Sequence, residues 1–243
     1  MAVTIRTGPL RDELCTMRAV PSLVAVMLVG ASCFTADPSE REEQRVTAAD
    51  GRLLCRLYRV NGIKEGAALL DLPNGGVKSG SYSGGLKNGL WTELDAAGDT
   101  TWCMGYTQGR AHGTWQRFTK GRLVYQAHYW NGMAHGPRLT WHTNGAPASL
   151  VRFVHGKEEG IAHRWRLSDE ENYGMHDTGP YVHGLAHGTW RRYYADGVLC
   201  NENEHVQGVM HGISTIYARD GTILRQSEYR NNNKVRTIVD RLK

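Results

Sequence analysis

A short glycine motif occurs seven times in the chain, and its period restricts the possible folds more than any other feature. Two copies follow the complete pattern Y-x-x-G-x-x-H-G-x-W: YTQGRAHGTW begins at Tyr106 and YVHGLAHGTW begins at Tyr181. The first glycines of the seven copies are Gly62, Gly85, Gly109, Gly132, Gly156, Gly184 and Gly208. The second glycines follow four residues later, at Gly66, Gly89, Gly113, Gly136, Gly160, Gly188 and Gly212. Successive copies are 23 or 24 residues apart except for one step of 28, and a fixed period of this size indicates a stacked repeat array.

Each repeat is predicted to contain two strands and two turns. The segment 122–130 alternates Leu123, Tyr125, Ala127 and Tyr129 with other residues, and a period of two indicates a strand. The Asn-Gly pair that follows at 131–132 is a strong hairpin signal. Because no helical pattern separates the strands, they are expected to pair antiparallel in sequence order. Fourteen or more strands at about 4.8 Å each would form a meander roughly 65 Å long.

Aromatic side chains recur in register and favour a single twisted layer. One column lies five residues after each second glycine: Leu94, Phe118, Trp141, Trp165, Tyr193 and Tyr217. Another lies three residues before each first glycine: Tyr82, Tyr106, Tyr129, Phe153, Tyr181 and His205. Such ladders stabilise a sheet through cross-strand contacts, and a hydrophobic content of 40% is low for a packed sandwich of this length. The predicted fold is all-β, an elongated single-layer antiparallel meander of stacked β-hairpin repeats. A closed barrel or two-layer sandwich is the alternative.

The motif string and its period resemble MORN repeats, and most closely the second class of these repeats, found in the YwqK-like antitoxin family. The resemblance covers about residues 58–230. It implies hairpins stacked into an elongated sheet and a role in scaffolding, protein binding or lipid contact. The last unit, at 229–233, keeps its tyrosine but loses both glycines, as is typical of a capping repeat.

The motif side chains are interpreted as structural. They are Tyr106, Gly109, His112, Gly113, Trp115, Tyr129, Gly132, His135, Gly136, Tyr181, Gly184, His187, Gly188, Trp190, Gly208, His211 and Gly212. Equivalent histidines in adjacent hairpins lie two strands apart, roughly 9–10 Å. Two imidazoles that share a zinc ion must each approach it to about 2.0–2.1 Å, so this ladder is not expected to bind metal. Glu202, Glu204 and His205 could form a cluster, but they are interpreted as polar faces of one strand.

Enzymatic function has little support in the sequence. The chain contains no HExxH, CxxC, GxSxG or Walker-type string, so neither catalysis nor a cofactor is expected. The formal net charge of +5 is modest and spread out, which argues against nucleic-acid binding. Cys55, Cys103 and Cys200 lie in different repeats, too far apart in an extended array for disulfides among them.

The step of 28 residues marks a candidate binding loop. The extra residues fall within 167–180, and the candidate contact residues are Asp169, Glu170, Glu171, Tyr173 and His176. Insertions in repeat proteins emerge on one face, often the binding face. The competing interpretation is a tolerated surface insertion, because lengthening a loop costs little closure entropy.

Residues 1–33 are predicted to be a signal peptide. The stretch from Ala19 to Ala31 has no charge and follows a basic residue, but it is too short to span a membrane. Its end, VGASC, resembles a bacterial lipobox, in which the cysteine, here Cys33, becomes lipidated. Ordinary signal-peptidase cleavage near Ser32 stays open. Because the acidic residues at 12–13 do not suit a signal peptide, translation is expected to start at Met17.

The remaining chain divides into a flexible tether at 34–50, which is charged and has no apolar period, and a repeat domain at 51–243. The favoured function is a non-catalytic scaffold that binds a protein partner and is anchored to a membrane through Cys33. It would lie in the bacterial cell envelope, on the periplasmic side of the outer membrane, or be secreted. The alternative is an antitoxin or immunity protein that sequesters a toxin. Exposed edge strands would also permit edge-to-edge homo-oligomers.

Overall fold

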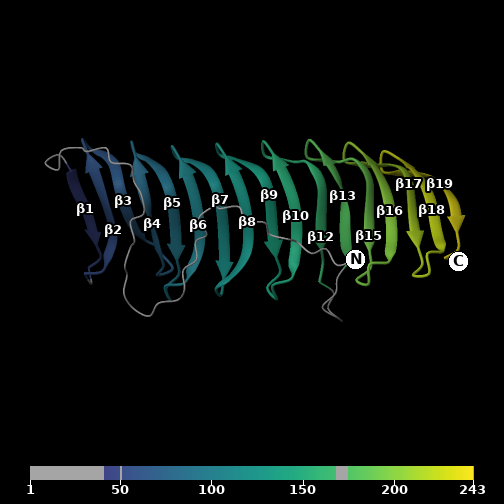
Figure 1. The fold of residues 1–243 in the computed structure, drawn as a ribbon, viewed down its shortest axis with the longest axis horizontal. Coiled ribbons are helices and arrows are strands. Elements are labelled where there is room, and N and C mark those ends of the chain that lie inside the picture. Colours follow the sequence, from purple (N-terminus) through teal and green to yellow (C-terminus); the bar gives the residue numbers. More distant parts are fainter. Residues whose placement is uncertain (1–40, 50, 168–174, 243) are drawn as a thin grey trace, which may run out of the picture.

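The computed structural model describes residues 41–49, 51–167 and 175–242, which form a single open antiparallel sheet. Nineteen strands follow one another in chain order and lie side by side in one layer (Figure 1). The strands are β1 (Arg41–Thr47), β2 (Leu53–Val60), β3 (Ile63–Asp71), β4 (Val77–Ser83), β5 (Leu86–Leu94), β6 (Thr100–Thr107), β7 (Arg110–Thr119), β8 (Arg122–Trp130), β9 (Met133–Trp141), β10 (Pro147–Val154), β11 (Lys157–Glu158), β12 (Gly160–Trp165), β13 (His176–Val182), β14 (Leu185–Ala186), β15 (Gly188–Tyr193), β16 (Leu199–Val206), β17 (Val209–Tyr217), β18 (Ile223–Arg230) and β19 (Asn233–Asp240).

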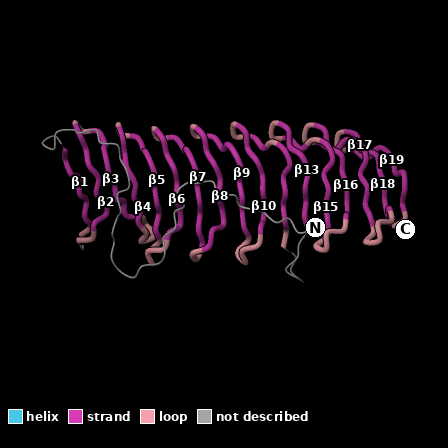
Figure 2. Tube along the Cα trace, in the orientation of Figure 1, coloured by secondary structure: helices cyan, strands magenta, loops and turns pink. Residues whose placement is uncertain are grey.

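Turns join the strands at both long edges of the sheet, and the described residues include no helix (Figure 2). Consequently, none of them forms a helix long and apolar enough to cross a membrane. The terminal strands β1 and β19 each pair with one neighbour, β2 and β18, so the described sheet does not close on itself. The predicted single-layer meander is therefore confirmed, and the barrel and sandwich alternatives are wrong.

The register explains why the motif needs both its second glycine and its aromatic residue. Each second glycine lies directly opposite the aromatic column residue of the following copy. The pairs are Gly66 with Tyr82, Gly89 with Tyr106, Gly113 with Tyr129, Gly136 with Phe153, Gly160 with Tyr181, Gly188 with His205 and Gly212 with Tyr229. These glycines have φ between +74° and +110°, a region that L-residues with a Cβ resist. Each repeat thus places a glycine with positive φ opposite an aromatic ring on the next strand.

Backbone hydrogen bonds also connect each turn to the preceding copy. The N–H of Gly109 donates to the carbonyl of Lys87 at 2.8 Å, and the N–H of Gly208 donates to that of Ala186 at 2.8 Å. The indole N–H of Trp115 donates to the Gly105 carbonyl on the neighbouring strand at 2.9 Å. Neighbouring repeats are therefore joined by turn and side-chain contacts as well as by the strand ladder.

The core is a thin row of side chains on one face of the sheet, here named the core face. Its first cluster contains Leu57, Ala68, Trp91 and Met104, and Trp91 is completely buried. A second cluster contains Val151, Phe153 and Ala162. Because side chains alternate between faces along a strand, the residues between these core positions lie on the other side, here named the opposite face.

Residues 41–47 depart from the tether expected at 34–50, because they form β1 and pair with β2 from Arg41–Val60 to Val46–Cys55. All seven side chains of β1 are exposed, so no apolar alternation marks this strand in the sequence. Backbone hydrogen bonding to the free edge of β2 is sufficient to order it.

Candidate functional site

The turns that contain the first glycines all lie along one long edge of the sheet, and apolar side chains project there. These side chains, which we name the apolar rim, are 40–58% exposed. The apolar rim consists of Ile63, Leu86, Trp130, Met133, Val182, Leu185 and Val206. Exposed apolar groups that recur in register form an extended surface rather than scattered single residues, and such surfaces mark interaction sites.

The apolar rim is held in place by the glycines of the next copy. A Cβ added to Gly109 would lie 3.4 Å from Cδ2 of Leu86, and one added to Gly208 would lie 3.4 Å from Cδ2 of Leu185. Each leucine therefore packs over the following turn. In two other copies the residue that follows the first glycine is a cation, Arg110 or Lys157. Apolar and basic groups thus share this edge, and the equivalent positions are about two strands apart, roughly 9–10 Å.

On the core face, Lys and Arg side chains lie over most rings of the aromatic column found three residues before each first glycine. The distances from cation to ring centroid are 5.0 Å for Lys64 on Tyr82, 5.0 Å for Lys87 on Tyr106, 4.4 Å for Arg138 on Phe153 and 5.3 Å for Arg164 on Tyr181. Cation–π contacts of this kind stabilise partly exposed aromatic rings. The core face is therefore a mixed aromatic and basic surface.

On the opposite face, four rings stack where β12 and β13 enter the long loop. Trp165 and His176 are nearly parallel, with centroids 5.0 Å apart, and Tyr193 continues the stack at 5.8 Å from His176. His163 Nδ1 and His176 Nε2 are 3.1 Å apart, so one of them, as an N–H, donates a hydrogen bond to the other. Burial lowers the pKa of both imidazoles, and the nearby His163 lowers that of His176 further. The stack therefore favours neutral histidines.

Of the stacked rings, only His176 belongs to the predicted binding loop. His176 lies in β13, at the point where the N–H of Arg166 donates to the carbonyl of Met175 at 3.0 Å. The candidates Asp169, Glu170, Glu171 and Tyr173 lie outside the described residues, as does Cys33. His163 was missed from sequence because its contact with His176 depends on the register across the insertion.

The motif histidines make local contacts that differ between copies. The ring of His112 packs on Trp130 at 4.6 Å, and the ring of His135 packs on His155 at 5.2 Å. His211 Nδ1 lies 3.4 Å from Oδ1 of Asn231. Within the described ranges, no group of three or more His, Cys, Asp or Glu residues could hold a metal ion.

Glu202, Glu204 and His205, the possible cluster in β16, do not converge. The Glu202 carboxylate accepts hydrogen bonds from Arg191 and from the Tyr217 hydroxyl on the opposite face. Glu204 accepts one from the backbone N–H of Ile213 at 2.8 Å. Cys55, Cys103 and Cys200 form no disulfides with one another.

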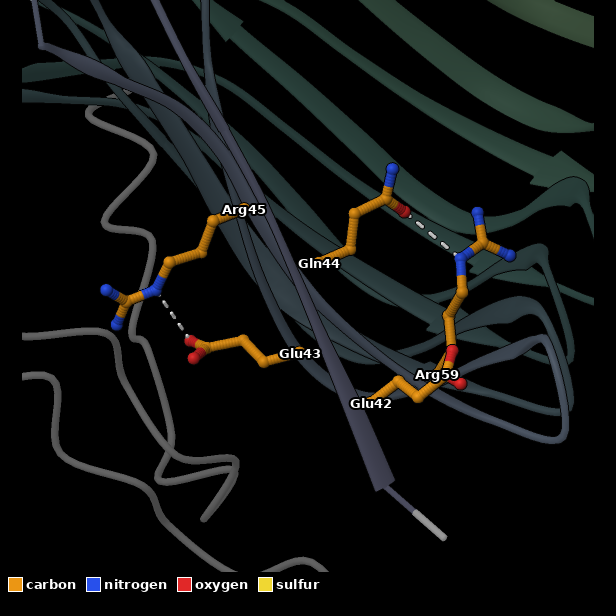
Figure 3. A pocket seen from close by; sticks show the side chains of 5 residues that line it. All are labelled: Glu42, Glu43, Gln44, Arg45 and Arg59. Carbon is orange, nitrogen blue, oxygen red and sulfur yellow. Dashed lines mark hydrogen bonds and ion pairs between the residues drawn. The ribbon is translucent and has the colours of Figure 1, made fainter.

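Strand β1 forms a charged edge rather than a pocket. Figure 3 shows Glu43 and Arg45 on one side of β1, whereas Glu42, Gln44 and Arg59 lie on the other. Arg45 Nε is 3.1 Å from Glu43 Oε1, and Arg59 Nε donates to Gln44 Oε1 at 3.1 Å. Side chains on both sides of a strand cannot enclose one ligand, and charged groups on an edge strand discourage pairing with another sheet.

At the other end of the sheet, β19 is irregular. Its register with β18 shifts twice, leaving Val235 and Ile238 without a partner opposite them. Bulges twist an edge away from further pairing. Both ends of the sheet therefore carry features that oppose the edge-to-edge association expected from sequence.

Comparison with known proteins agrees with this architecture. The sequence profile of the MORN repeat variant family matches residues 186–206 and 210–231, the part of the chain that contains β15 to β18. No curated protein matches the chain in sequence. The match supports a MORN repeat protein, and such repeat sheets suggest a non-catalytic scaffold.

Proposed function

We propose that the chain is a binding scaffold whose apolar rim docks a protein partner. The observation that carries this proposal is the rim itself: seven apolar side chains, each 40–58% exposed, recur at the glycine turns along one edge. Burying such groups is the main favourable term in protein association, at about 25 cal/mol per Å² of apolar surface. The partner would present apolar side chains, with carboxylates opposite Arg110 and Lys157.

Attachment to a membrane through Cys33 is part of the proposal, as is a place in the cell envelope. It rests on the lipobox-like sequence that ends at Cys33 and on the uncharged stretch before it. Labelled fatty acid should be incorporated into the full chain and not into Cys33→Ala. Equal labelling of both proteins would contradict the anchor.

A photo-crosslinking experiment tests the rim. Benzoylphenylalanine replaces Leu86, Met133 or Leu185 in the full chain, expressed in its native cells. The matched controls replace Thr119 or Thr143, which are exposed outside the first-glycine turns. We expect one common crosslinked protein from the three rim positions, and its loss when the other two rim residues are changed to glutamate. Equal crosslinking from the control positions would contradict the docking surface.

The antitoxin hypothesis fits the YwqK-like resemblance and stays a prediction. It requires that the crosslinked partner be a toxin and that loss of this gene be lethal in the presence of the toxin. Normal growth of the deletion strain with an active toxin would exclude it.

A further inference from the structure

A hollow of about 290 Å³ opens on the core face between β13 and β16, against Trp190. Its lining includes Asp177, Ala186, Arg192, Asn201, Asn203 and His205. A comparison of two repeats explains how this hollow arises. Each residue that lines it has an equivalent 99 positions earlier in the chain, in the second copy.

In the second copy the equivalent space is filled. Lys87 extends over the ring of Trp91, with Nζ 4.7 Å from the centroid, and over that of Tyr106 at 5.0 Å. Met104 lies opposite Trp91 and is buried. Trp91 itself is 0% exposed under this cover.

In the sixth copy the indole is kept, and its cover is reduced to the guanidinium of Arg164, which lies 5.7 Å from the centroid of Trp190. Lys87 is replaced by Ala186, Trp102 by Asn201, Met104 by Asn203 and Tyr106 by His205. All four replacements are smaller, and together they leave the hollow beside Trp190. The residue beneath the indole is a glycine in both copies: Gly179 lies under Trp190, and Gly80 lies under Trp91.

The polar groups of the hollow are held in place by other side chains. Asp177 is 8% exposed and forms a two-point ion pair with Arg192, with Oδ1–Nε at 2.6 Å and Oδ2–Nη2 at 3.1 Å. Asn203 Oδ1 accepts a hydrogen bond from the Ser214 hydroxyl, and Asn201 donates to the Thr215 carbonyl. These groups are therefore preorganised for binding.

The hollow carries no excess of negative charge. The Asp177 carboxylate is paired with the guanidinium groups of both Arg192 and Arg166, so it is not available to attract an ammonium group. An aromatic ring flanked by side-chain amides suits a neutral ligand with an apolar face and hydroxyl or amide groups.

We propose that the hollow between Trp190 and His205 binds a saccharide ring, stacked on the indole and hydrogen-bonded to Asn203. Repeats with the full lysine and methionine cover would lack this site. The scaffold would then carry a small-ligand site on its core face, separate from the apolar rim.

The test titrates the full chain with N-acetylglucosamine and with glucose while indole N–H signals are followed by NMR. Trp190→Phe assigns the signal of Trp190. We expect a saturable shift of that signal and of the side-chain amides of Asn201 and Asn203. Ala186→Lys should restore the cover seen in the second copy and weaken binding by at least about tenfold, a difference of about 1.4 kcal/mol.

The matched control is Ala111→Lys, which makes the same substitution at the equivalent position of the third copy. It should leave the affinity within about twofold, a change below 0.5 kcal/mol. Unchanged signals of the other indoles would show that both variants are folded. The proposal is overturned if neither sugar shifts the Trp190 signal, if Ala111→Lys weakens binding as much as Ala186→Lys does, or if tetramethylammonium binds the hollow and the sugars do not.

Discussion

The substitution Gly80→Ala tests the packing that holds the array together. An alanine Cβ at this position would lie 2.3–2.5 Å from three ring atoms of Trp91, a separation that real contacts do not permit. The φ of Gly80 is not in the left-handed region, so the cost is steric. Because Trp91 is completely buried, its ring cannot move without displacing Met104 or Ala68. Overpacking of this kind typically costs 1–3 kcal/mol and occasionally more, and the three short contacts lead us to expect about 3 kcal/mol.

A double-mutant cycle with Trp91→Ala isolates this contact, measured by urea unfolding with circular dichroism. Trp91→Ala alone should cost about 3–5 kcal/mol. In that background Gly80→Ala should cost nothing or stabilise by about 0.5–1 kcal/mol, as alanine does relative to glycine within a strand. The coupling energy is then about 3 kcal/mol. The control Gly89→Ala places a Cβ in open space at φ +74° and should cost about 1 kcal/mol in both backgrounds. An equal cost of Gly80→Ala with and without the indole would refute the argument.

Three further outcomes are expected. Since the folded pKa values of His163 and His176 lie below the unfolded value of 6.5, the unfolded chain binds more protons as the pH falls below that value. Thermal stability should therefore drop between pH 7 and pH 5, and less so in a variant with both histidines changed to glutamine; identical pH profiles would contradict this. Trp115→Phe removes the hydrogen bond to the Gly105 carbonyl and should cost about 1 kcal/mol in urea unfolding, whereas Phe118→Leu serves as a control without such a bond. Asp177→Ala leaves two guanidinium groups without their carboxylate and should cost about 1–3 kcal/mol, against a much smaller change for the exposed Asp99→Ala.

The sequence predicts the fold well because the signals that specify it are local. Alternation along 122–130 and the Asn-Gly turn at 131–132 each specify a strand or a hairpin without distant partners. Joining such hairpins in order leaves the antiparallel meander as the simplest result. The strand β1 escaped prediction for the opposite reason, because its pairing depends on the exposed backbone of β2 and not on its own charged side chains.

The surfaces were harder to predict, since they arise from residues in neighbouring copies. The apolar rim could have been found from the position after the first glycine, where Ile63, Leu86, Met133 and Leu185 recur. To predict the hollow beside Trp190 from sequence, one must compare residues on two strands of the sixth copy with their equivalents in the second copy. The sequence also shows both aromatic columns but not that they lie on opposite faces, which follows from the observed register.

Small-angle X-ray scattering of the full chain tests the central claim, that one open layer exposes both faces and the apolar rim. Strands spaced at about 4.8 Å make the sheet roughly 75–80 Å long, about 30 Å wide and one layer thick, so its radius of gyration should be about 24 Å or more. A compact domain of the same length would give about 18 Å. An asymmetric distance distribution that extends to at least about 75 Å is expected. A symmetric distribution with a radius near 18 Å would contradict the open sheet and the functions proposed for its surfaces.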